Sequence, residues 1–252
     1  MPASATLRLQ IERSLEARFP AALTPVPRTI RETAATGIAA VDELLDGGFP
    51  VGAISELVGP SCSGRTSLAL AFLAERTAEE RFCAWVDAED AFDPESAAAS
   101  GVLLEQLLWV RCGGAKKERE KNWTRLEQAL KATDLLLQAG GFAAIVLDLA
   151  GIDPTEGMRI PLATWFRYRQ AADRTRCSLL VLGRASYAQS SAAMVLDAEP
   201  MRLEEVGGTM LHAGAFALSR RRQRFPQQWN NARKPPTSTW TASAPWAVEQ
   251  SA

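Results

Sequence analysis

The sequence is poor in the residues that build metal centres and disulfide frameworks. It has one histidine, His212, and four cysteines, none of them in a C-x-x-C pair or at a metal-ligand spacing: Cys62, Cys83, Cys112 and Cys177. This pattern is typical of reduced cysteines in a cytosolic protein and argues against a disulfide-stabilised secreted domain. We therefore assign no metal-binding role to the cysteines and no catalytic role to His212.

Net charge and long apolar runs are also lacking. Lys and Arg total 28 against 29 Asp and Glu, so the overall charge gives no support for binding to nucleic acid or membrane. Any basic surface must be local. The most apolar window, 135–152, is interrupted by glycine and polar residues, which excludes a membrane span. The first residues do not combine a basic region with an apolar run, as a signal peptide does. These features predict a cytoplasmic protein.

The most informative stretch lies between Val58 and Ser67. It has the frame of the phosphate loop G-x-x-x-x-G-K-[ST], with Gly59, Pro60, Ser61, Cys62, Ser63, Gly64, Arg65 and Thr66, followed by Ser67. The glycines let successive N–H groups point at an anion, and the helix that follows adds its positive end. In this frame the basic side chain reaches the outer phosphates, and the threonine hydroxyl is offered to Mg²⁺. The loop predicts a site for ATP and Mg²⁺.

The surroundings of the loop agree with this interpretation. Residues 53–58 are predicted as a short strand, and residues 67–74 are strongly helix-forming. Strand, loop and helix in that order form the context that the motif requires. The alternative is a Gly/Ser loop that caps a helix and binds no ligand.

Arg65 stands where the motif has lysine. Arginine keeps the charge but carries a planar fork on a longer stem, whereas lysine delivers a compact point charge. Phosphoryl transfer depends mostly on positioning, so it should suffer more from this change than phosphate binding does. The sequence therefore predicts a nucleotide site of weakened or vestigial activity.

Apolar runs alternate with helix-forming segments through the middle of the chain. Strands are expected at 53–58, 82–86, 107–110, 143–148 and 178–182, and helices at 39–45, 67–74, 123–138 and 162–174. This alternation predicts an α/β fold, with a mostly parallel sheet covered by helices on both faces. Residues 194–197 and 213–219 are expected as antiparallel strands added on the C-terminal side. Acidic residues 87–90 and Asp148 follow apolar strands, where such sheets bind ligands.

The two ends of the chain differ from this core, which we expect to span 31–224. Residues 1–30 hold an amphipathic helix, apolar at Leu7, Ile11, Leu15 and Phe19, and a prolyl linker. The helix must bury its apolar side on its own domain, on a second copy or on a partner. Residues 225–252 are predicted as a disordered tail. Its tryptophans, Trp229, Trp240 and Trp246, either dock on a partner or fold back on the domain.

Several stretches, in the order in which they occur, resemble the core domain of the RecA family: 36–52, 59–66, 85–94, 145–148 and 207–208. The resemblance implies a RecA-like fold. It also implies that Glu89 activates the attacking water, that Thr66 and Asp148 belong to the Mg²⁺ site, and that Asp93 and Arg184 lie at nucleotide-contacting positions. In that family an N-terminal helix docks on the adjacent subunit of a filament, which would suit residues 7–19.

The chain also departs from the RecA pattern. The loop lysine is Arg65, the aromatic residue that stacks on adenine is Ser96, and the glutamine that senses the γ-phosphate is Arg184. The segment that matches a mobile DNA-binding loop, 185–192, is followed by acidic residues that would repel a phosphate backbone. These departures argue against a working recombinase.

A RecA-like chain with these losses resembles the ImuA family. The resemblance implies an accessory protein of translesion synthesis in the SOS response to DNA damage, cytoplasmic and associated with the nucleoid when engaged. Its implied partners are an ImuB-like Y-family protein, RecA and an error-prone DnaE-like polymerase. The alternative is an active DNA-dependent ATPase that retains Glu89, Asp148 and Thr66.

Two local clusters of arginine could contact DNA phosphates without reading sequence. One surrounds the helix after Asp148 and the other closes the core: Arg159, Arg167, Arg169, Arg174 and Arg176, and Arg220, Arg221, Arg222 and Arg224. The alternatives are a charged helix face and a charged edge strand that prevents aggregation.

Overall fold

The computed structural model describes residues 31–113, 124–206, 210–224 and 236–243. The predictions for the N-terminal helix and its linker, for Trp229 and Trp246 and for the 207–208 glycines lie outside the described residues. Within the described residues, no helix is long and apolar enough to cross a membrane.

The main sheet of the described residues has nine strands in the order β11-β10-β8-β3-β7-β6-β4-β5, with β9 paired to β10. Its strands are β3 (Ile54–Val58), β4 (Cys83–Asp87), β5 (Leu107–Arg111), β6 (Ala144–Asp148), β7 (Ser178–Gly183), β8 (Met194–Ala198), β9 (Arg202–Val206), β10 (Met210–Gln223) and β11 (Thr237–Ser243). Strands β3 to β8 pair in parallel, and β9, β10 and β11 are antiparallel additions. The predicted α/β fold with a mostly parallel sheet is confirmed.

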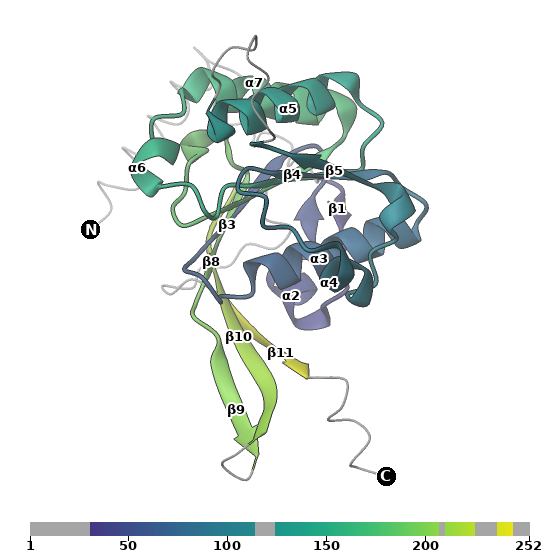
Figure 1. Cartoon of the computed structure of the whole chain (residues 1–252), viewed down its shortest axis with the longest axis vertical. Helices are drawn as coiled ribbons and strands as arrows, with labels where there is room; N and C mark the ends of the chain where they lie inside the picture. The colour runs from purple at the N-terminus through teal and green to yellow at the C-terminus, as the bar shows by residue number, and fades with distance from the viewer. Residues whose placement is uncertain (1–30, 114–123, 207–209, 225–235, 244–252) are drawn as a thin grey trace, which may run out of the picture. The chain divides into compact units, whose positions relative to one another are not determined.

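Helices cover both faces of this sheet (Figure 1). The bounds are α2 (Ala39–Leu44), α3 (Arg65–Ala78), α4 (Pro94–Ala99), α5 (Arg125–Ala139), α6 (Pro154–Gly157) and α7 (Leu162–Thr175), with 3₁₀ turns η1 (Leu104–Gln106) and η2 (Gln189–Ser191). Helices α2, α3 and α4 lie on one face, and α5 and α7 lie side by side on the other. A separate two-stranded sheet, β1 (Thr33–Ala34) with β2 (Phe49–Pro50), was not predicted.

The apolar runs of the sequence become strands that are buried on both faces. In β4, Trp85 packs into the core under α3, while its neighbours Ala84 and Val86 pack into the core under α5 and α7. Strand β6 divides in the same way, with Val146 on one side and Ile145 on the other. Because successive side chains of a strand point to opposite faces, a strand covered on both faces is apolar at most of its positions, not only at alternate ones.

Two expectations about the C-terminal half were wrong. Strand β8 runs parallel to β3, not antiparallel to the sheet, because the chain crosses from β7 over β3 before β8 begins. Residues 237–243, expected in a disordered tail, form β11 on β10, and Trp240 stacks on Phe216 with ring centroids 5.1 Å apart. Trp240 therefore folds back on the domain, which is one of the two alternatives for the tail.

Candidate nucleotide site

The phosphate loop, Gly59–Thr66, connects β3 to α3 as predicted. Cys62 and Gly64 take positive φ values of 57° and 79°, which turns the backbone back toward the helix. Leu68 is the first residue of α3 whose N–H reaches a carbonyl, that of Gly64. In the described part of the chain, the N–H groups of residues 61–67 donate to no acceptor. Such a set of free amides at a helix N-terminus suits a phosphate group.

The loop is enclosed by the C-terminal strands, and this explains both of its glycines. A Cβ atom on Gly59 would lie 2.5 Å from the carbonyl oxygen of Ala198, and one on Gly64 would lie 2.5 Å from the ring of Phe216. The N–H of Met201 donates to the carbonyl of Cys62 at 2.9 Å. The end of β8 and the middle of β10 therefore fix the conformation of the loop.

Arg65 does not extend into the space faced by the free amides. Its guanidinium is buried and donates from Nη1 to the carbonyl oxygen of Gly183 at 2.5 Å. The same carbonyl accepts the N–H of Gly59 at 3.1 Å. Burial lowers the pKa of Arg65, and the charge of Asp148 opposes that shift. Arg65 thus joins the phosphate loop to the carboxyl end of β7.

The residues expected to hold Mg²⁺ lie at the same edge of the sheet. Thr66 is exposed in the first turn of α3, and Asp148 ends β6, where its Oδ1 accepts the N–H of Ala150 at 2.9 Å. Burial raises the pKa of Asp148 to about 6; the nearby Asp87 adds to the rise and Arg65 opposes it. Within the described residues no three His, Cys, Asp or Glu side chains are grouped to hold a metal. A hydroxyl and a carboxylate suit Mg²⁺, whose remaining ligands come from phosphates and water.

Glu89 is engaged in an ion pair. Its Oε2 lies 3.2 Å from Nη1 of Arg125, the first residue of α5. Its side chain packs so closely over Gly151 that a Cβ atom there would approach Glu89 Cγ to 2.4 Å. Helix α5 is itself fixed at this end by a capping box between Thr124 and Glu127. Sequence reasoning missed Arg125, because nothing local links two residues 36 positions apart.

The turn after β4 is organised by a buried carboxylate, Asp87, which in the sequence is only one member of the acidic run 87–90. Asp87 accepts the N–H groups of Glu89, Ala91 and Phe92, at 3.2, 3.1 and 2.8 Å. The carboxylate of Asp93 caps α4, accepting from the N–H groups of the first turn. Asp93, which was predicted to contact nucleotide, therefore serves as the N-cap of α4 in this structure.

The segment after β7 is held by a second buried carboxylate. Glu56, in the middle of β3, accepts from Ser186 Oγ at 2.5 Å and from the N–H groups of Tyr187 and Ala188 at 2.6 and 2.8 Å. The Tyr187 ring is buried against Gly183. Arg184 is exposed and makes no hydrogen bond or ion pair in the part of the chain described. Sequence reasoning missed Glu56, since an acidic residue in an apolar strand gives no sign of its partner.

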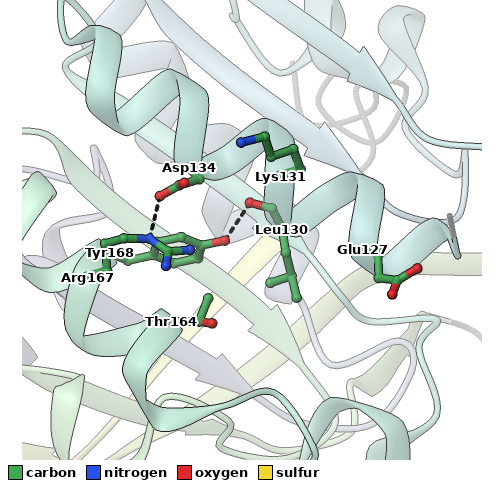
Figure 2. Close-up of a pocket in the computed structure, with 7 residues that line it drawn as sticks. All are labelled: Glu127, Leu130, Lys131, Asp134, Thr164, Arg167 and Tyr168. Atoms are coloured by element: carbon green, nitrogen blue, oxygen red, sulfur yellow. Dashed lines mark hydrogen bonds and ion pairs between the residues drawn. The ribbon is translucent and has the colours of Figure 1, made fainter. Parts of the chain in front are cut away.

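The arginines around α7 are mostly committed within the domain. Arg167 donates to Asp134 at 2.9 Å across a groove of about 490 Å³ between α5 and α7. Figure 2 shows the residues that line this groove. Arg174 bonds Gln138, and Arg176 pairs with Glu32. Only Arg159 and Arg169 of this cluster lack a carboxylate or amide partner among the described residues.

Most arginines of the second cluster also have partners within the domain. Arg220 donates to the carbonyl of Leu44 and pairs with Asp46, and its side chain is only 10% exposed. Arg221 pairs with Asp197, and Arg222 donates to the carbonyl of Ala192 at 3.2 Å. Arg224 has no side-chain partner in the described residues. Neither cluster is a continuous array of free guanidinium groups.

Comparison with known proteins places these features in a family. The model of the RecA N-terminal domain family matches residues 10–159. The chain is 40% identical over 125 residues to Protein RecA of Brucella canis, Brucella suis and Brucella abortus, covering 49% of this chain and 32% of each relative. It therefore spans about a third of the length of these relatives. The crystal structure of the RadB recombinase has the same fold, with a TM-score of 0.55 at 18% identity, covering 82% of this chain and 94% of that one. The chain belongs to the RecA N-terminal domain family.

Proposed function

We propose that this protein is a RecA-like accessory protein of DNA-damage-induced translesion synthesis, of the ImuA type, which acts through protein contacts. Its proposed partners are an ImuB-like Y-family protein, RecA and a DnaE-like polymerase. The observation that carries the proposal is the state of the two side chains that catalysis needs most. Arg65 is bound to the carbonyl of Gly183, and Glu89 is paired with Arg125.

These two contacts bear directly on phosphoryl transfer. The reaction needs a cation placed on the transferred phosphate and a carboxylate placed on the attacking water. A buried arginine that leaves its carbonyl partner gives up a charge-assisted hydrogen bond. A carboxylate held in an ion pair must leave its partner before it can orient the attacking water. The site therefore favours slow turnover over efficient hydrolysis.

Nucleotide binding is proposed to persist in a weakened form. The free amides of residues 61–67 would hold phosphates, and Thr66 and Asp148 would hold Mg²⁺, which would neutralise phosphate charge. This retained set is the observation that favours the second candidate, an active DNA-dependent ATPase. Bound nucleotide in the first candidate would stabilise the domain without driving a cycle.

Direct DNA contact is proposed to be weak and nonspecific. Of the C-terminal cluster, Arg220, Arg221 and Arg222 are held by carboxylates or carbonyls, which leaves Arg224. An acidic side chain, Asp197, accompanies the cluster and would oppose a phosphate backbone. Protein contacts thus carry more of the proposed function than DNA contacts do.

The two candidates are separated by steady-state ATP turnover with Mg²⁺ across a titration of single-stranded DNA, with Glu89→Gln as the blank. The accessory role predicts turnover no faster than the blank, together with loss of damage-induced mutagenesis in cells that lack the protein. DNA-stimulated turnover that disappears in Glu89→Gln would replace the accessory role by the ATPase. Normal mutagenesis in cells that lack the protein would refute the translesion assignment.

A further inference from the structure

Helix α7 and the turn before it carry a line of large apolar side chains that face outward. Met158, Leu162 and Phe166 are 49%, 52% and 48% exposed, and they are spaced four residues apart in the sequence. Leu162 and Phe166, four residues apart in α7, lie on one side of that helix, and Met158 lies in the turn that precedes it. The opposite side of α7 is buried through Trp165 and Tyr168. We call the three exposed residues the α7 stripe.

The α7 stripe leads into a small cavity of positive character. One turn beyond Phe166, helix α7 contributes Arg169, Gln170 and Asp173 to a cavity of about 210 Å³, which Arg224 lines from the end of β10. The guanidinium of Arg169 lies over the Phe166 ring, 5.0 Å from its centroid, so the stripe and the cavity adjoin. We call this the basic cavity.

The charges of the basic cavity do not balance. Its single carboxylate, Asp173, is paired with the third arginine of the lining, Arg31, at 2.6 Å. Arg169 and Arg224 have no carboxylate partner in the described residues. Two cations beside an exposed apolar stripe therefore offer a site for a group of negative charge. Such a combination is typical of protein contact surfaces, in which Phe, Met and Arg are enriched.

The chemistry favours a peptide over a nucleic acid as the occupant. Strands of nucleic acid need open aromatic faces for stacking and a row of cations along the backbone. Here Arg169 already covers one face of Phe166, and Met158 and Leu162 are aliphatic. The cations are gathered at one end of the stripe. An amphipathic helix with apolar side chains at a four-residue spacing and carboxylates at one end matches both parts.

We propose that the α7 stripe and the basic cavity together bind an acidic amphipathic helix of a partner protein. The apolar side of that helix covers Met158, Leu162 and Phe166, and a carboxylate enters the basic cavity between Arg169 and Arg224. Seven residues separate Leu162 from Arg169, a rise of about 10 Å, so two to three helical turns suffice. The inference rests on the proposed function in that it gives the accessory protein one of its partner surfaces.

Binding is measured by fluorescence anisotropy with the full chain and two synthetic helical peptides. Both peptides carry leucine at three positions four residues apart. The acidic one has two glutamates one turn beyond the last leucine, and the basic one has lysines there. The acidic peptide should bind at least tenfold more tightly, and rising salt should weaken it.

Variants of the chain locate the contact. Leu162→Asp should lower the affinity for the acidic peptide at least tenfold. The double variant Arg169→Glu, Arg224→Glu should reverse the preference toward the basic peptide. The matched controls lie on α5: Leu135→Asp replaces another leucine that is 56% exposed, and Lys131→Glu reverses another exposed cation. Both controls should bind the acidic peptide like the unaltered chain.

Equal binding of the two peptides, or equal losses in the α5 controls, would overturn the inference. So would a single-stranded oligonucleotide that binds in place of the peptide and loses affinity with Leu162→Asp, since the surface would then be one for nucleic acid. These outcomes do not depend on the proposed function, which fails instead if damage-induced mutagenesis is normal without the protein. Unchanged peptide binding by Leu162→Asp would exclude this surface even where mutagenesis is lost.

Discussion

Nη1 of Arg65 donates to the carbonyl oxygen of Gly183 at 2.5 Å and so closes the phosphate loop onto the end of β7. The two residues are 118 positions apart, and the same carbonyl also accepts the N–H of Gly59. The residue that replaces the expected lysine therefore has a partner within the fold. It stabilises the edge of the sheet at which the candidate nucleotide site lies.

The first prediction concerns Arg65. Arg65→Ala should lower the free energy of unfolding by about 1–3 kcal/mol, because it removes a charge-assisted hydrogen bond from a buried carbonyl. Chemical denaturation measures this change, with the exposed Arg111→Ala as control. An unchanged stability combined with loss of nucleotide binding would mean that Arg65 serves the phosphates instead.

Release of Glu89 from its ion pair should increase turnover. Arg125→Ala leaves the carboxylate free to accept a proton from water, and we expect ATP turnover to rise on the order of tenfold, part of what a positioned base contributes. Stability should change by less than about 1 kcal/mol, because both side chains are partly exposed. The double variant Arg125→Ala, Glu89→Gln should return turnover to the blank; a rise that persists there would refute the role of Glu89.

Stability should depend on pH through Asp148 when Mg²⁺ is absent. Because its pKa in the folded state, about 6, is above the usual value of 3.8, the folded state holds a proton that the unfolded state loses first. The resulting stabilisation is complete below about pH 4 and is lost as the pH rises through 6. Asp148→Asn should therefore be more stable than the unaltered chain at pH 7, by on the order of 2 kcal/mol. Denaturation at pH 4 and pH 7 checks this, and a variant without gain at pH 7 would contradict it.

Glu56 should be essential for the segment that follows β7. Glu56→Gln keeps one acceptor oxygen for the N–H groups of Tyr187 and Ala188 and turns an amide donor toward the Ser186 hydroxyl, but it removes the negative charge from all three hydrogen bonds. We expect a loss of about 3 kcal/mol in unfolding free energy and faster proteolytic cleavage near residue 186. Glu156→Gln, at an exposed position of α6, is the control. Equal cleavage of the two variants would show that Glu56 does not anchor this segment.

Strand β11 should be part of the cooperative fold. Trp240→Ala removes a buried ring that stacks on Phe216, and we expect a loss of about 3–5 kcal/mol. Thr239→Ala, on an exposed position of the same strand, should cost less than about 1 kcal/mol. Tryptophan fluorescence and circular dichroism during urea unfolding follow both. Equal stability of Trp240→Ala and the unaltered chain would mean that residues 237–243 are not part of the cooperative fold.

The sequence by itself determined the order and type of the elements that form the core. The mostly apolar runs at 83–87 and 144–148 became parallel strands because a strand that is buried on both faces needs apolar residues at consecutive positions, which is a local property of the sequence. The phosphate loop was identifiable for the same reason, since its glycine spacing and the helix after it are local properties.

Only the tertiary structure decided how the functional side chains are used. The contact of Arg65 with Gly183, the pairing of Glu89 with Arg125 and the support of the segment after β7 by Glu56 join residues 36 to 132 positions apart. Strand register and crossover direction bring such residues together, and the chain does not display either as a local pattern. The direction of β8 and the return of β11 onto β10 were misjudged because they depend on which edge of the sheet is left to be paired.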